Sequence, residues 1–264
     1  MRQRTQSAVL IALALVTAAW SPLPAKAHDG QLHHVNDQMR QAAEEFLSAL
    51  TPELQAQVRF PFDGVQRTNW HYVPMERVGV PFKAMSLEQR RAARKLMRSV
   101  LSDKGYLKAT TIMSLEQVLR AMEAGRDGVD SIRDPEKYWF ALFGDPAGDE
   151  PWGWRVEGHH LSLNFTSEDG VVASFAPLFL GANPAEVRVG PRSGLRALGS
   201  EEDAARELMA SFTDQQRERV LITEEAPREV LTVPGAPIDL GAPAGLALRE
   251  MTAEQQQLLK ALVR

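Results

Sequence analysis

Hydrophobic and polar positions alternate most regularly between Trp152 and Thr166, in the run Trp-Gly-Trp-Arg-Val-Glu-Gly-His-His-Leu-Ser-Leu-Asn-Phe-Thr. Such alternation is typical of paired strands, and the dipeptide Glu157-Gly158 offers a glycine for a two-residue turn. The pattern therefore predicts a β-hairpin in which Val156 faces His159 and Arg155 faces His160. One face would then be apolar apart from His159. The other face would carry Gly153, Arg155, His160, Ser162 and Asn164.

Apolar residues recur at helical spacing in several other segments. They predict helices over residues 37–50, 86–101 and 114–124, and one more helix with Thr51 as its N-cap and Pro52 at its first position. Residues 138–143 and 171–175 are predicted strands, and residues 60–81 carry loop signals. Together these elements predict an α+β fold in which helices flank a mostly antiparallel sheet.

Part of this pattern occurs twice. Residues 42–58 align without gaps on residues 204–220, and residues 85–89 align on residues 251–255 at nearly the same offset. This ordered recurrence predicts an internal tandem duplication. The second copy breaks off inside its last helix, which has no C-cap, so that copy is expected to be incomplete and the chain truncated.

The N-terminus has the three parts of a secretory signal peptide. Arg2 and Arg4 precede an apolar run over residues 8–20, and Ala25-Lys-Ala27 matches a small-residue cleavage motif. Cleavage after Ala27 would export the protein to the periplasm or the medium. Because the apolar run is shorter than the roughly 20 residues that span a bilayer, no stable membrane anchor is expected after cleavage.

These patterns give a domain organisation. Residues 1–27 would be the signal peptide and residues 28–36 a flexible histidine-containing tail. Residues 37–190 would form the first repeat, helices followed by the hairpin. Residues 200–264 would form a partial second repeat that packs on the first. In the tail, the new N-terminal amine and the imidazole of His28 could chelate copper; the alternative is a disordered segment that is merely rich in histidine.

Composition narrows the function classes. The 264 residues are 44% hydrophobic and 24% charged, which is a globular composition. The formal net charge of −4 comes without a basic block, so nucleic acid is not an expected partner. The chain has no cysteine, which excludes disulfides, thiol catalysis and cysteine metal sites.

Three runs resemble the DUF3500 family of exported proteins of unknown function. They are Arg67 with Trp70-His-Tyr-Val-Pro74 and Arg77-Val-Gly79, then residues 154–166, then Pro177-Leu-Phe-Leu-Gly-Ala-Asn-Pro184. The resemblance covers most of the mature chain and is most specific in the Gly-His-His-Leu-Ser-Leu-Asn-Phe-Thr run. It implies longer relatives with an Asn- and His-rich strand segment near the C-terminus, ending in a His-x-His pattern. It implies no activity.

The polar face of the hairpin holds the candidate chemistry. His160 is predicted as a general base or metal ligand, with Ser162 beside it as the second candidate catalytic residue. No G-x-S-x-G elbow and no orienting carboxylate accompany them. His71 lies in a predicted loop and could be a second ligand, for zinc or copper. Arg155 and Asn164 are predicted to bind substrate, and Arg155 suits an anionic group.

Three interpretations of this face stay open. It could be a structural polar layer covered by the loop over residues 60–81. It could be a metal site of an oxidoreductase or hydrolase. It could also be a metal-free pocket of a non-catalytic binding protein for a polar or anionic small ligand. Trp152 and Trp154 could stack on a sugar, but they share a face with aliphatic residues, so core packing is the stronger interpretation.

Overall fold

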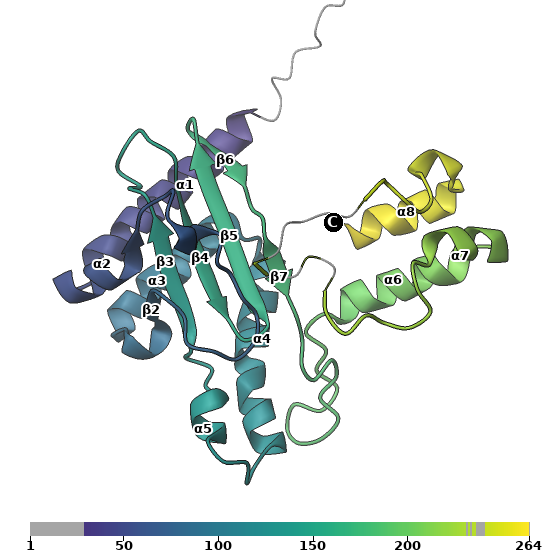
Figure 1. Cartoon of the computed structure of the whole chain (residues 1–264), viewed down its shortest axis with the longest axis horizontal. Helices are drawn as coiled ribbons and strands as arrows, with labels where there is room; N and C mark the ends of the chain where they lie inside the picture. Colours follow the sequence, from purple (N-terminus) through teal and green to yellow (C-terminus); the bar gives the residue numbers. More distant parts are fainter. Residues whose placement is uncertain (1–28, 231, 233, 236–240, 264) are drawn as a thin grey trace, which may run out of the picture.

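The computed structural model describes residues 29–230, 232, 234–235 and 241–263, so the predicted signal peptide and His28 lie outside the described residues (Figure 1). The helices are α1 (Asp29–Ala49), α2 (Pro52–Val58), α3 (Leu87–Val100), α4 (Asp103–Met122), α5 (Val129–Ile132), α6 (Gly199–Ser211), α7 (Asp214–Val220) and α8 (Ala253–Leu262). The strands are β1 (Arg59–Phe60), β2 (Val80–Pro81), β3 (Tyr138–Phe143), β4 (Trp152–Gly158), β5 (Leu161–Glu168), β6 (Val171–Ser174) and β7 (Leu178–Leu180). None of the described helices is both long and apolar enough to cross a membrane.

The strands form one mixed sheet in the order β1-β3-β4-β5-β6, with β2 also paired to β3 and β7 to β5. Among the described strands only β1 and β3 run parallel, and the other pairs are antiparallel. The predicted α+β class with a mostly antiparallel sheet is therefore confirmed. The two predicted strands at residues 138–143 and 171–175 are present as β3 and β6.

One face of the sheet forms the core together with α1, α3 and α4. Side chains from β3, β4 and β5 that alternate onto this face pack against Met39 and Phe46 of α1 and Leu96 of α3. The buried set from the strands is Tyr138, Phe140, Leu142, Trp152, Trp154, Val156, Leu161, Leu163 and Phe165. Trp154 stacks on Phe165 with ring centroids 4.8 Å apart, which confirms the tryptophans of β4 as core residues.

The predicted hairpin is present, but its predicted register is wrong. The turn lies at His159-His160 instead of Glu157-Gly158, and Val156 pairs with Leu163 instead of His159. Arg155 accordingly pairs with Asn164, not with His160. The observed partner of Val156 lies four residues beyond the predicted one. Because this difference is even, the strand side chains lie on their predicted faces. The two histidines are the exception, since they lie in the turn and not in a strand.

Two helices begin earlier than predicted. α1 begins at Asp29 and takes in residues that were expected to form a tail. α4 begins at Asp103, where Ser102 caps it by accepting a hydrogen bond from the Gly105 amide at 3.1 Å, whereas the sequence pattern placed the start near residue 114. Its first turns carry few apolar residues at helical spacing, and burial of Ala109 and Ile112 stabilises them instead.

α6, α7 and α8 form a group beyond β7 and repeat the organisation of α1, α2 and α3 (Figure 1). The Nε2 of Gln89 in α3 donates to the carbonyl of Ala49 at 3.1 Å, and the Nε2 of Gln255 in α8 donates to the carbonyl of Ser211 at 2.9 Å. Each glutamine also completes a capping box at the start of its helix. These matched contacts agree with the aligned sequence positions, and common origin by duplication stays a prediction.

Candidate functional site at the hairpin turn

The β4–β5 turn is fixed by backbone contacts to two other segments. The amide of His160 donates to the carbonyl of Tyr72 at 2.8 Å, and the carbonyl of His160 accepts from the amide of Gly181 at 2.8 Å. His160 has a φ of 58°, the left-handed conformation that closes a tight turn. Gly158 comes just before the turn, where an added Cβ would lie 2.3 Å from the ring of Tyr138. The close approach of this ring therefore requires glycine.

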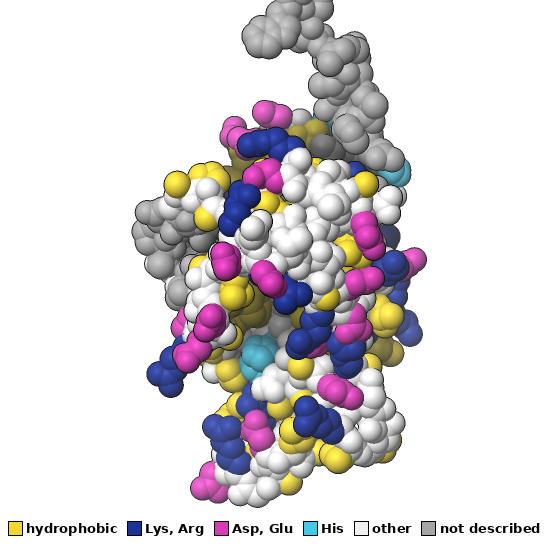
Figure 2. Space-filling view, turned by 90° about the vertical axis from the view of Figure 1, so that its right-hand side faces the viewer, with side chains coloured by type: hydrophobic (Ala, Val, Ile, Leu, Met, Phe, Trp, Pro, Cys, Tyr) yellow, Lys and Arg dark blue, Asp and Glu magenta, His cyan; other side chains and the backbone are white. Residues whose placement is uncertain are grey.

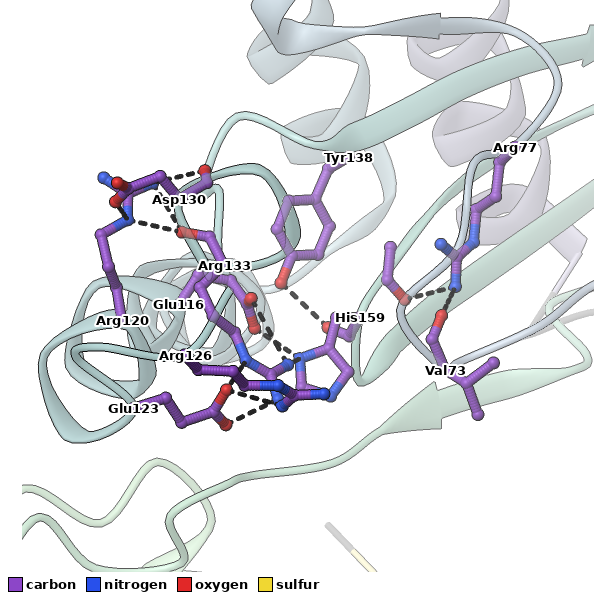
Figure 3. Close-up of polar contacts among 11 residues, drawn as sticks. Val73, Arg77, Glu116, Arg120, Glu123, Arg126, Asp130, Arg133, Tyr138 and His159 are labelled. Carbon is purple, nitrogen blue, oxygen red and sulfur yellow. Dashed lines mark hydrogen bonds and ion pairs between the residues drawn. The ribbon is translucent and has the colours of Figure 1, made fainter. Parts of the chain in front are cut away.

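The turn places His159 against helix α4. Its Nδ1 lies 2.5 Å from Oε1 of Glu116, and both side chains are buried (Figure 3). Nδ1 therefore donates to the carboxylate, so in the neutral form of the imidazole Nε2 is the nitrogen without a proton. Among the described residues Nε2 has no hydrogen-bond partner. The carboxylate of Glu116 thus orients the imidazole and leaves its second nitrogen without a partner among the described residues.

Arg133 completes a buried charge network around this pair. Its guanidinium binds the carboxylate of Glu123 with two hydrogen bonds, from Nε at 3.2 Å and from Nη2 at 2.8 Å (Figure 3). Its Nη1 lies 3.3 Å from Nδ1 of His159 and 3.9 Å from Oε2 of Glu116. The guanidinium therefore supplies a positive charge beside the buried Glu116 carboxylate.

Tyr138 holds the backbone of the same turn. Its hydroxyl donates to the carbonyl of His159 at 2.9 Å, and burial raises the pKa of this phenol well above its ordinary value. The phenol therefore stays protonated and serves as a fixed donor. Because Tyr138 lies on β3, the imidazole of His159 is positioned by three elements at once: the turn, the helix α4 and the neighbouring strand.

A cavity of about 220 Å³ opens beside the Glu116–His159 pair. It lies between the loop after residue 73, the start of β3 and the helix α5. Its polar lining comes from Glu76, Arg77, Glu116, Ser131, Asp134, Lys137, Tyr138 and His159. A space of this size accepts a small polar molecule together with a few waters, and charges of both signs surround it.

Near the turn, the polar face of the hairpin, opposite the core, holds a buried network of charged side chains. Nε of Arg155 lies 3.0 Å from Oε1 of Glu157, and Oε2 of Glu157 accepts the amide of His71 at 3.0 Å. Burial raises the pKa of Glu157, and the charge of Arg155 opposes that shift. Arg77 pins the covering loop by donating to the carbonyls of Val73 and Gly158. This geometry favours the interpretation of a structural layer covered by the loop.

The other predicted site residues do not converge. Ser162 is fully buried and accepts a hydrogen bond from Nδ2 of Asn164 at 3.1 Å, so neither side chain is paired with an imidazole. His71 reaches Glu157 through its backbone amide, whereas His160 stands at the turn with its ring 4.0 Å from that of His159. The predicted side-by-side placement of Arg155 and His160 is wrong, because the turn was misplaced.

His160 is half-buried, and burial lowers its pKa to about 4, helped by His159 and Arg133. Its Nδ1 is buried without a hydrogen-bond partner. Among the described residues no three histidine, aspartate or glutamate side chains are grouped so that they could share a metal ion. The predicted zinc or copper ligands, His71 and His160, therefore lack a third such side chain.

The sequence patterns do not single out Glu116, Arg133 or Glu157 as site residues. A signal for Glu116 existed, because this acid lies at helical spacing from the apolar residues Ile112 and Leu119 and so interrupts a buried stripe. Glu157 shares a strand face with Arg155, two residues away, but it was assigned to the turn. Arg133 follows a short helix, and nothing in its local sequence marks it.

A family model described as "Protein of unknown function (DUF3500)" matches residues 33–264. The chain belongs to the DUF3500 family. The match covers nearly all of the described residues of this DUF3500 protein and confirms the resemblance seen in its sequence. No curated protein and no solved structure matches it. The chemistry of this DUF3500 protein therefore has to be inferred from its own residues.

Proposed function

We propose that this DUF3500 protein is an exported enzyme in which His159 acts as a general acid–base on a small polar substrate. One observation carries the proposal: Glu116 fixes Nδ1 of His159 at 2.5 Å while Nε2 is left without a partner, beside a cavity of about 220 Å³. A carboxylate that orients an imidazole in this way is a recurring device of acid–base catalysis.

The pair suits hydrolysis. Nε2 can take a proton from a water molecule in the cavity, and the imidazolium that forms is stabilised by the buried carboxylate of Glu116. The water oxygen bonds to the acyl or phosphoryl centre of the substrate as the bond from that centre to the leaving group breaks, and the same Nε2 returns the proton to the leaving group. None of these steps needs a redox cofactor.

The surface also favours a small substrate. On the side of α6 to α8, basic and acidic side chains are interspersed, and hydrophobic side chains line a hollow next to a histidine (Figure 2). That side carries no single-sign field of the kind that attracts nucleic acid. The proposal of export rests on the sequence of residues 1–27 alone.

The test combines chemical modification with a substrate screen. Diethyl pyrocarbonate modifies accessible unprotonated imidazoles, so peptide mapping should find His159 modified at neutral pH. A panel of p-nitrophenyl esters and phosphates is then screened for turnover. His159→Gln should lower turnover of any active substrate about 100-fold or more. The matched control is His34→Gln, because His34 is exposed on α1 and contacts Gln38. A resistant His159, or full turnover by His159→Gln, would refute the proposal.

The second candidate function is non-catalytic binding of a polar or anionic ligand. The specific observation in its favour is a different and larger cavity, of about 520 Å³, which contains Arg67. Arg155, the residue first expected to bind such a ligand, is only 1% exposed and already paired with Glu157. The two candidate functions use separate residues and can be tested separately.

A further inference from the structure

The cavity that contains Arg67 lies on the polar side of the sheet, far from the turn. Its floor is one row of residues across four strands, because Phe143 pairs with Gly153, Gly153 with Thr166, and Thr166 with Ser174. Gly153 is separated from His159 by six residues of nearly extended chain, which is about 20 Å at ~3.3 Å per residue. The cavity is therefore a separate site.

Gly153 sits in the middle of this floor. An added Cβ would lie 2.5 Å from the carbonyl oxygen of Phe165, a contact with backbone that cannot move aside. The close approach of β5 therefore requires glycine in β4. As a result no side chain projects into the cavity from the centre of this row, between Phe143 and Thr166.

Arg67 supplies the charge of the cavity. Its guanidinium lies over the ring of Phe62, 4.1 Å from the centroid, and its Nη2 donates to Oγ1 of Thr166 at 3.2 Å. Among the described residues no carboxylate pairs with it. Arg67 is also the only charged side chain in the described lining, so it gives this lining a positive charge. A half-buried guanidinium that is oriented yet unpaired is a ready partner for a carboxylate.

Aromatic and neutral polar groups complete the wall. Trp70 is half-buried at the cavity, with its ring centroid 6.1 Å from that of Phe179. Asn164 donates through Nδ2 to the carbonyl of Pro177 at 2.8 Å, and its side-chain oxygen has no hydrogen-bond partner among the described residues. Thr68 and Ser174 add hydroxyl groups. A guanidinium beside an indole ring and several hydroxyl groups can bind a ligand that consists of a ring with an attached carboxylate.

We infer that this cavity binds a small monocarboxylate attached to an aromatic or sugar ring. The carboxylate takes the free donors of the Arg67 guanidinium, and the ring lies against Trp70. The volume of about 520 Å³ fits a ligand of this size and falls in the usual range for small-molecule pockets. This inference is independent of acid–base chemistry at His159.

The test uses four probes: benzoate and glucuronate as acids, and benzamide and glucose as their neutral counterparts. Binding to the full chain is measured by titration calorimetry and by quenching of tryptophan fluorescence. The acids should bind at least tenfold more tightly than the neutral compounds. Arg67→Gln should abolish this preference, and Arg67→Lys should keep part of it. Arg59→Gln is the matched control, since the ion pair of Arg59 within the described part of the chain, with Asp145, is exposed.

Three results would overturn the inference. The first is equal binding of acids and neutral compounds by the wild type, or binding of neither at millimolar concentration. The second is an unchanged preference in Arg67→Gln. If Arg67→Gln does not fold, Trp70→Ala decides the question, and unchanged affinity for benzoate in that variant is the third. His159→Gln should bind benzoate like the wild type, so failure here is distinguishable from failure of the acid–base proposal.

Discussion

Arg155 and Glu157 form an ion pair within a single strand, with Nε and Oε1 3.0 Å apart and both side chains at most 3% exposed. They can meet because residues two apart on a strand share a face. Arg77 approaches the same carboxylate, with Nε 3.8 Å from Oε2. Glu157 therefore supplies the negative charge that neutralises two buried guanidinium groups. Because Arg77 belongs to the loop over residues 60–81, Glu157 also joins the hairpin to this covering loop.

Replacing Glu157 should lower the stability of the folded protein. Glu157→Gln leaves Arg155 and Arg77 buried without a counter-charge, which typically lowers the free energy of unfolding by about 3–5 kcal/mol. Urea denaturation followed by circular dichroism measures the loss. The matched control is Glu76→Gln, because Glu76 forms an exposed pair with Lys137 and should change stability by less than about 1 kcal/mol. Equal stability of the two variants would contradict the prediction.

His160 should make stability depend on pH. Its pKa is about 4 in the folded protein and near 6.5 when unfolded, so between these values the unfolded chain binds the extra proton. The contribution of His160 to stability is therefore present above pH 6.5 and is lost as pH falls towards 4, by up to about 3 kcal/mol. His160→Asn suits the left-handed backbone and should flatten this slope in melts at several pH values. An unaltered slope would show that another group titrates.

Glu116 should set the tautomer of His159. In the wild type, Nδ1 donates to the carboxylate, so ¹⁵N NMR of labelled histidine should report the neutral imidazole of His159 as the tautomer that carries its proton on Nδ1. Glu116→Gln weakens this preference, because an amide can also donate to Nδ1. The signals of His159 should then shift towards the other tautomer, while those of His34 stay unchanged. Identical His159 signals in both proteins would remove the basis of the acid–base proposal.

Export should leave a defined N-terminus. Expression of the full chain in a bacterium with a periplasm, followed by mass spectrometry, should give a mature protein that begins at His28 in the periplasmic fraction. Ala27→Asp places a charge in the small-residue cleavage motif and should leave the precursor uncleaved. Unprocessed wild-type protein in the cytoplasm would contradict both the cleavage site and the export.

Local sequence determined much of the framework. Threonine and serine caps mark the starts of α2 and α3, and strict alternation marks β4 and β5. The alternation also assigned Arg155 and Asn164 to one face and the tryptophans to the other. These faces are correct although the predicted turn is wrong. Val156 pairs with Leu163 instead of His159, which is a shift of four residues, and an even shift leaves each side chain on the same face.

The sequence by itself thus determined most of the helices, the presence of the hairpin and its apolar face, since these depend on periods of 3.6 and 2 within short segments. Only the tertiary structure decided the turn and the site. Contacts of His160 with Tyr72 and Gly181 select the turn, and the ring of Tyr138 fills the space beside Gly158. Glu116 meets His159 across 43 residues of chain. Such a meeting is set by packing of α4 on the sheet, and no local pattern encodes it.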